Sequence, residues 1–158
     1  MASIDYNAVF QSFYSKVEAF DFLELDEATV YDFLCNWIHT AVRPTYIRHL
    51  FSSIKFDDDV MRLTYEISNP LGDEEDKDFV IELLALGIGI QWLTPQVNSA
   101  INLRQVYGSK EEKFYSQSQQ ITALQNLLSY WKKEQRRMIC DRGYIHNDYV
   151  NGVDLITS

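Results

Sequence analysis

Residues 79–93 have the sequence FVIELLALGIGIQWL, in which only Glu82 and Gln91 interrupt an otherwise apolar run. A helix that is apolar around its whole circumference is stable in water only when other elements surround it. Crossing a bilayer takes about 20 consecutive apolar residues, and this run is shorter. The run therefore predicts a buried core helix, with the rest of the chain packed around it.

The residues on either side of this run favour a helix over a strand. Residues 73–76 are all acidic, and negative side chains stabilise a helix N-terminus. Pro95 cannot donate a backbone hydrogen bond, so we expect the first helical segment to stop or kink at Thr94. A buried strand is the alternative, because Gly87 and Gly89 each weaken a helix interior by about 1 kcal/mol. Length and the acidic start favour the helix.

The rest of the chain is predicted to be mostly helical. Apolar residues recur every three or four positions in residues 6–20, 26–41, 45–53, 97–108 and 116–142, which predicts a helix in each. Asp26 is suited to cap the second of these helices. Ser116 with Gln119 forms a capping box for the last one, and Gly143 is expected to end it.

Residues 60–68 alternate between apolar and polar side chains, which predicts a strand with one face toward water. Its pairing partner is left open by the sequence: residues 54–56 across an Asp-rich turn, another subunit, or the C-terminal tail. The predicted fold class is thus mainly α, a helical bundle around the central helix 79–93, with one short strand or hairpin near residues 54–68. Residues 1–143 form a single domain, and residues 144–158 form a tail that a neighbouring subunit could order.

The chain is acidic, and its charge is uneven. The net charge is −9, which argues against a free-standing nucleic-acid binder, because such proteins use many Lys and Arg to displace phosphate counterions. Through residue 100 there are seventeen Asp and Glu against six Lys and Arg, a net −11; from residue 101 there are six against eight, a net +2. Identical subunits could meet head to tail through these halves, although pairing within one chain is the simpler explanation. The aromatic content of 14% also favours a protein that forms interfaces.

Two charged clusters are the candidate interaction sites. The basic cluster has four-residue spacing on the last predicted helix and consists of Lys132, Lys133, Arg136 and Arg137. It could contact phosphates or the acidic half of a neighbouring subunit, and a merely solvated helix face explains it equally well. The acidic cluster lies in the turn before the predicted strand and consists of Asp57, Asp58 and Asp59.

The sequence offers little for catalysis or cofactor binding. Cys35 and His39 lie four residues apart with Asp32 nearby, but no third orienting group is evident, so we interpret them as core packing. The segment from Gly87 to Gly89 lacks the third glycine of a dinucleotide loop, and the acidic runs lack the ligand pattern of a calcium loop. We therefore expect no enzymatic activity, no cofactor and no bound metal. Cys35 and Cys140 are expected to be free thiols in a reducing compartment.

A family resemblance rests on two segments. The sequence ELLALGIGIQWLTPQV at residues 82–97, followed by KFYSQS at residues 113–118 and a long helix, resembles small structural proteins of tailed bacteriophages that are encoded among the head and neck genes. The similarity covers roughly residues 74–149, and a weaker similarity extends to residues 20–41. Gly89 and Gln91 stand where a bulkier apolar residue and an acid are expected.

The resemblance implies a non-enzymatic virion protein that is assembled in the host cytoplasm. As a head-tail connector or neck adaptor, it would form a homo-oligomeric ring that contacts the portal and the tail or other neck proteins, without a membrane. DNA would pass nearby without sequence-specific binding, and an acidic lining would keep the duplex sliding. The alternative is a small cytoplasmic regulatory protein of phage origin that binds another protein.

Overall fold

The structure of the chain, a computed structural model, describes residues 1–17, 27–106 and 111–145. Within these ranges the prediction of a mainly α fold with a short β element is confirmed. The elements in chain order are β1 (Ala2–Asp5), α1 (Tyr6–Lys16), α2 (Glu27–Ala41), α3 (Thr45–Arg48), β2 (Phe51–Asp57), β3 (Arg62–Ile67), α4 (Asp73–Val106) and α5 (Glu111–Ile145).

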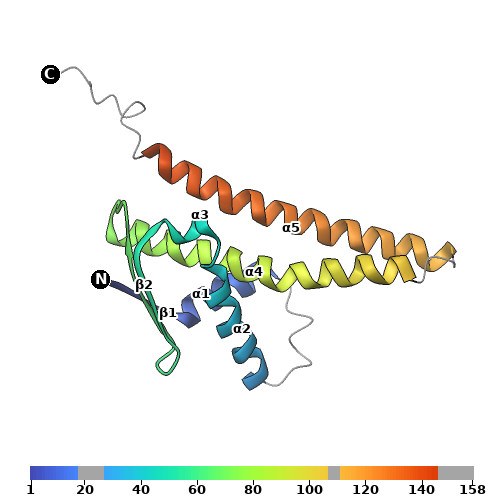
Figure 1. Cartoon of the computed structure of the whole chain (residues 1–158), viewed down its shortest axis with the longest axis horizontal. Helices are drawn as coiled ribbons and strands as arrows, with labels where there is room; N and C mark the ends of the chain where they lie inside the picture. Colours follow the sequence, from blue (N-terminus) through green and yellow to red (C-terminus); the bar gives the residue numbers. More distant parts are fainter. Residues whose placement is uncertain (18–26, 107–110, 146–158) are drawn as a thin grey trace, which may run out of the picture.

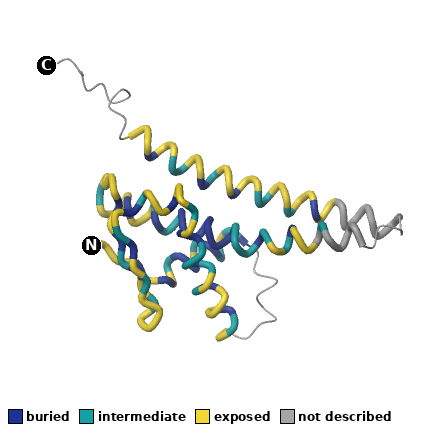
Figure 2. Tube along the Cα trace, viewed as in Figure 1, coloured by how far each residue is buried: buried dark blue, intermediate teal, exposed yellow. Residues whose placement is uncertain are grey.

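Helix α4 is the central element, and its apolar segment is buried as predicted. Helices α1, α2 and α5 pack around it, and β1 also contacts it (Figure 1). The fully buried residues of the segment include Val80, Leu83, Leu84 and Ile88. The residues 73–99 are long and apolar enough to cross a membrane, but 56% of the most apolar window is buried inside the protein. Figure 2 shows this burial along the middle of α4, so the segment is the core helix of the fold.

The charged interruption in the apolar run has partners on α1. Glu82 forms a salt bridge with the Nζ atom of Lys16 and accepts a hydrogen bond from the Ser12 hydroxyl at 3.1 Å. Its carboxylate is therefore compensated at the edge of the core, where an unpaired charge would oppose packing.

Of the two outcomes expected at Thr94, a stop or a kink, the stop is wrong: helix α4 continues through Pro95 and includes the segment from residue 97, which was predicted as a separate helix, as far as Val106. Pro95 is exposed and removes only the hydrogen bond that residue 95 would donate. Two backbone carbonyl groups in the turn before the proline, those of Ile90 and Trp92, accept hydrogen bonds from side chains. Thr94 Oγ1 donates to the Ile90 oxygen at 2.6 Å, and Gln96 Nε2 donates to the Trp92 oxygen at 3.2 Å. In an α-helix, a proline at position 95 leaves the carbonyl group of residue 91 without its donor, so these two bonds flank that carbonyl and do not replace the lost bond.

The sheet has the strand order β1-β3-β2, and both pairings are antiparallel. The predicted hairpin is confirmed: β2 pairs with β3 across the turn that holds the acidic cluster. The other edge of β3 is covered by β1, with Ile4 opposite Leu63. The alternation in β3 is also confirmed, because Leu63, Tyr65 and Ile67 are buried while Arg62 and Glu66 are exposed.

The predicted helix over residues 45–53 is wrong beyond Arg48. Helix α3 covers only Thr45–Arg48, and Phe51 begins strand β2. The spacing of apolar residues in this segment fits both structures, and the pairing of Phe51 with Ile67 on β3 decides for the strand.

Helix α5 runs back along α4, and the two form a long antiparallel hairpin that extends beyond the sheet and the shorter helices (Figure 1). On its α4 side, Ile121, Trp131 and Gln135 are buried. The two glycines of α4 lie at close contacts. A Cβ atom on Gly89 would lie 2.9 Å from the Trp131 ring, and one on Gly87 would lie 2.7 Å from the Cβ atom of Ala41 on α2.

Both predicted ends of the last helix need correction. The helix begins at Glu111, so Ser116 lies inside it and is not its N-cap. The helix also continues through Gly143 to Ile145. The salt bridge between buried Arg142 and Asp76 on α4 holds the last turn in place and outweighs the weak helix propensity of glycine.

The remaining sequence predictions fall partly outside the described residues. Helix α1 confirms the helix predicted over residues 6–20 as far as Lys16, but Val17 is already extended and ends it. Helix α2 confirms the helix predicted over residues 26–41 from Glu27 onward, and Asp26 itself lies outside the described residues. The tail proposed for residues 144–158 is described only at Tyr144 and Ile145, which belong to α5.

Candidate functional site

The basic cluster lies on the outer face of α5. Because Trp131 and Gln135 face α4, residues 132, 133, 136 and 137 point away from the core, and all four are exposed. This arrangement follows directly from their spacing, since positions one and two residues away from a buried seam lie on the opposite side of a helix.

Arg137 is compensated by acids on its own helix. Its guanidinium donates hydrogen bonds to Glu134, the shortest at 2.8 Å, and to Asp141 at 3.0 Å. The hydrogen bond from Arg137 lowers the pKa of the Glu134 carboxyl, and the same bond raises the pKa of Arg137. Arg137 is therefore the member of the cluster least available to a partner.

The other three basic residues have no such compensation. Lys132 and Lys133 form no salt bridge with any residue that the structure describes. The Arg136 guanidinium lies over the Tyr46 ring, 5.9 Å from its centroid, which leaves its charge unneutralised. Lys132, Lys133 and Arg136 thus present a positive surface to solvent.

The acidic cluster occupies the β2–β3 turn, but its three members differ in their surroundings. Asp58 accepts a hydrogen bond from the Tyr6 hydroxyl at 2.5 Å and lies 2.9 Å from Nε2 of His39. The Tyr6 bond, and after it the His39 contact, lower the pKa of the Asp58 carboxyl. Asp57 and Asp59 are exposed and form no salt bridge within the described ranges. Asp58 therefore stabilises the turn through these contacts, whereas Asp57 and Asp59 present their negative charge to solvent.

The two clusters lie apart within one chain. Helix α5 runs along one side of α4, and the β2–β3 turn projects on the other side (Figure 1). The clusters therefore do not neutralise each other inside the molecule. Pairing between the charged halves of one chain does occur elsewhere, through Arg142 on α5 and Asp76 on α4.

The residues weighed for catalysis do not form a reactive site. The ring of His39 contacts Asp58 and packs against Phe56, with centroids 4.3 Å apart, while Asp32 is exposed. Cys35 Sγ lies 3.8 Å from Met61 Sδ, and burial raises the pKa of its thiol. A thiol held protonated is a poor nucleophile. Cys35 and Cys140 are both free thiols, with Cys35 half-buried and Cys140 exposed.

No group of three His, Cys, Asp or Glu side chains within residues 1–17, 27–106 and 111–145 is arranged to hold a metal ion. The sequence pattern does not predict the role of Tyr6, whose hydroxyl donates a hydrogen bond to Asp58, 52 positions away. The contact between His39 and Asp58 is likewise not predicted by the sequence. Local spacing carries no signal for contacts of this range, so only the folded chain shows them.

Comparison of the chain with protein-family models, with curated proteins and with solved structures gives no match in any of the three.

Proposed function

We propose that this chain is a non-enzymatic structural adaptor of a tailed-bacteriophage particle, which forms a ring between the portal and the tail. The observation that carries the proposal is the placement of uncompensated charge. Lys132, Lys133 and Arg136 face solvent on α5, while Asp57 and Asp59 face solvent on the β2–β3 turn. A contact between different faces of identical subunits closes into a ring when its rotation allows.

The net charge suits a position around the DNA path. With −9 overall, a ring of such subunits would repel phosphates, so a duplex could pass without adhering. The resemblance of residues 82–97 and 113–118 to small head and neck proteins of tailed phages supports the same role. The proposed location is the virion, after assembly in the host cytoplasm.

A charge-exchange experiment tests the head-to-tail contact. The variants K132E/K133E and D57K/D59K each place like charges at the proposed contact, so each alone is expected to remain monomeric where the wild type assembles. An equimolar mixture of the two is expected to assemble again with the variants alternating, because every contact then joins an acidic face of one variant to a basic face of the other. Analytical ultracentrifugation at low and high salt measures both effects, since exposed ion pairs weaken with salt.

The matched control for K132E/K133E is K55E/K77E, which makes the same change in net charge at two exposed lysines on β2 and α4. It is expected to assemble like the wild type. Asp58 is left unchanged because it braces the turn through Tyr6 and His39.

Partner proteins complete the test. The full chain is mixed with the portal and neighbouring neck proteins of the same phage, and purified particles are searched for it by mass spectrometry. Assembly on those partners and presence in particles would support the adaptor. A chain that stays monomeric, does not bind the portal or neck proteins and is absent from particles would contradict the adaptor proposal and favour the protein-binding regulatory role.

A further inference from the structure

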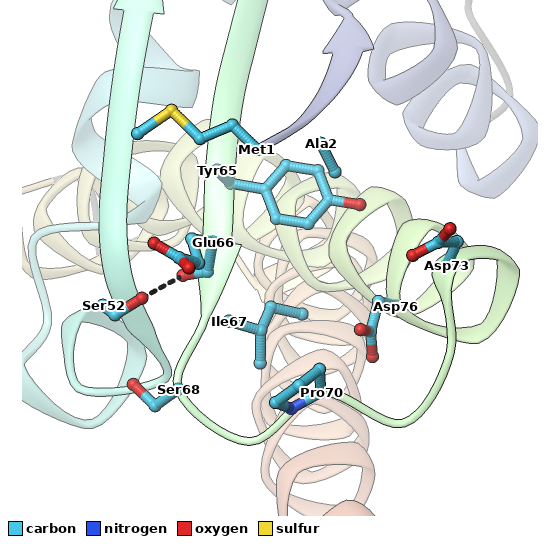
Figure 3. Close-up of a pocket in the computed structure, with 10 residues that line it drawn as sticks. All are labelled: Met1, Ala2, Ser52, Tyr65, Glu66, Ile67, Ser68, Pro70, Asp73 and Asp76. Atoms are coloured by element: carbon cyan, nitrogen blue, oxygen red, sulfur yellow. Dashed lines mark hydrogen bonds between the residues drawn. The ribbon is translucent and has the colours of Figure 1, made fainter.

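A cavity of about 360 Å³ lies between the sheet and the start of α4 (Figure 3). Its walls come from Met1, the start of β1, β2, β3, the loop after β3 and the first turn of α4. Cavities that hold small ligands span about 300 to 1,000 Å³, so this one suits a small molecule or a single side chain.

Tyr65 gives the cavity its unusual feature. The residue is 2% exposed, and its buried hydroxyl has no hydrogen-bond partner within the part of the chain that the structure describes. In Figure 3 the ring extends across the cavity, and the hydroxyl is directed toward the start of α4, where Asp73 and Asp76 lie. Buried hydroxyl groups are normally bonded, because an unsatisfied one costs about 1 to 3 kcal/mol.

The carboxylates of Asp73 and Asp76 lie on the α4 side of this hydroxyl, and the cavity wall also includes Glu66 and Met1, which carries the N-terminal ammonium group. Asp73 is exposed and forms no salt bridge with any described residue. Asp76 is partly neutralised, because its Oδ1 atom accepts hydrogen bonds from Arg142 and from the Leu71 N–H. Burial and then the nearby carboxylates of Asp76 and Asp73 raise the pKa of the Tyr65 phenol, which therefore stays protonated. An anionic ligand would be repelled here.

A metal ion is also a poor fit, since no three acidic, His or Cys side chains of the described chain are grouped to bind one. An organic cation fits better. Ile67 and Pro70 supply apolar wall beside the Tyr65 ring, and the carboxylates lie beyond the hydroxyl (Figure 3).

We propose that this cavity binds a primary ammonium group carried on a short alkyl stem. The ammonium donates to the Tyr65 hydroxyl oxygen and to the Asp73 carboxylate, and the stem lies against Ile67 and Pro70. Three N–H donors on one nitrogen match a phenol oxygen and carboxylate oxygens that converge from two elements. The ammonium comes either from a free alkylamine or from a lysine side chain of a second copy of this chain. The second source rests on the proposed self-assembly, and the first does not.

Titration of the full-length, ¹⁵N-labelled chain with n-butylammonium chloride tests the site by NMR. Saturable shifts are expected at the backbone amides of Ser52, Tyr65, Ser68 and Asp73, with a Kd on the order of 1 mM for so small a ligand. Tetramethylammonium, which has no N–H donor, and butyrate, which is an anion, are expected to cause no saturable shifts at these amides.

Two variants separate binding from folding. Y65F keeps the ring and removes the hydroxyl, so it is expected to be at least as thermally stable as the wild type and to bind n-butylammonium about tenfold more weakly. D73N is expected to weaken binding similarly, while D78N, an exposed acid on the same helix, is not. Absence of saturable shifts, or wild-type affinity in both Y65F and D73N, would overturn the proposal.

Unlabelled chain added to the labelled chain identifies the source. Shifts at the same amides on addition of the unlabelled wild-type chain, lost when the labelled chain is D73N, assign the ammonium to a second copy. Shifts on addition of n-butylammonium, without shifts on addition of unlabelled chain, assign the ammonium group to a free amine. Loss of the cavity site would leave the charge-exchange result intact, so the failure of one proposal is distinguishable from the failure of the other.

Discussion

Gln135 on α5 donates a hydrogen bond from its Nε2 atom to the backbone carbonyl oxygen of Leu83 on α4, over a distance of 3.2 Å. The glutamine is 2% exposed, and its Oε1 atom accepts a hydrogen bond from the Tyr46 hydroxyl at 3.3 Å. One buried polar side chain thus connects α3, α4 and α5. Because its amide is satisfied on both sides, it fixes the register of the long hairpin instead of opposing burial.

We expect Q135A to lower the free energy of unfolding by about 1 to 3 kcal/mol, because it leaves the Tyr46 hydroxyl without this partner and opens a void beside Leu83. Urea denaturation followed by circular dichroism measures the change. The matched control is Q125A at an exposed position of the same helix, which should change stability by less than about 0.5 kcal/mol. Equal effects of the two variants would contradict a role for Gln135 in hairpin register.

Gly89 and Gly143 provide opposite predictions for the same substitution. A Cβ atom on Gly89 would lie 2.9 Å and 3.0 Å from carbon atoms of the Trp131 ring, whereas nothing lies within 4 Å of a Cβ on Gly143. We expect G89A to be destabilising by about 1 to 2 kcal/mol, since overpacking outweighs the gain in helix propensity. G143A is expected to be stabilising by up to about 1 kcal/mol.

A second substitution checks the cause. W131F removes the ring atoms that meet the new Cβ atom, so G89A should cost less in a W131F background than in the wild type. Thermal unfolding of the four chains measures this coupling. A G89A variant as stable as G143A would show that α5 does not approach α4 as closely as described.

The sequence predicts those parts of the fold that depend on local pattern. The composition of residues 79–93 identifies the core helix, because a run that is apolar on all sides has few other stable environments. Alternation identifies β3, and the nearby apolar residues 54–56 identify one of its partners. For the candidate sites, spacing along α5 predicts that Lys132 and Lys133 are exposed, which the structure confirms.

The sequence fails where distant contacts override local preference. Strand β1 has only four residues, too few for a periodic signal, and it forms because β3 offers a free edge. Pro95 lies within α4, where its local preference for ending a helix is overridden. The cavity beside Tyr65 is assembled from the N-terminus, three strands, a loop and a helix start, so no single segment of the sequence predicts it.

The bond between Tyr6 and Asp58 predicts the pH dependence of stability. The folded-state pKa of Asp58 lies below its ordinary value of 3.8, chiefly because of this bond. In that range the folded chain binds fewer protons than the unfolded chain, so the contribution is present above pH 3.8 and is lost as pH falls through the folded pKa. The pKa of Tyr6 is raised above 10.0 by burial and by the same bond, so its contribution is lost as pH rises beyond 10.

D58N should therefore flatten the decline in stability on the acidic side, whereas burial of Tyr6, the larger cause of its raised pKa, preserves most of the decline on the alkaline side. Urea midpoints of wild type and D58N, measured from neutral pH into acid, are expected to differ most near neutrality and to converge as pH falls. D59N makes the same charge change at an exposed neighbour and should retain the wild-type decline. A wild-type pH profile in D58N would exclude the Tyr6 bond as its source.

The pair of Arg142 and Asp76 predicts how the end of α5 is held. Each is 7% exposed, and the Arg142 guanidinium also donates to the Asn69 carbonyl oxygen at 2.9 Å. Breaking a buried ion pair leaves one charge without a partner, so R142M should lower the free energy of unfolding by about 3 to 5 kcal/mol. D76N in the R142M background removes that orphaned charge, so the double variant should be more stable than R142M alone. If R142M and the double variant unfold at the same urea concentration, Asp76 is hydrated without Arg142, and the salt bridge does not fix the last turn of α5.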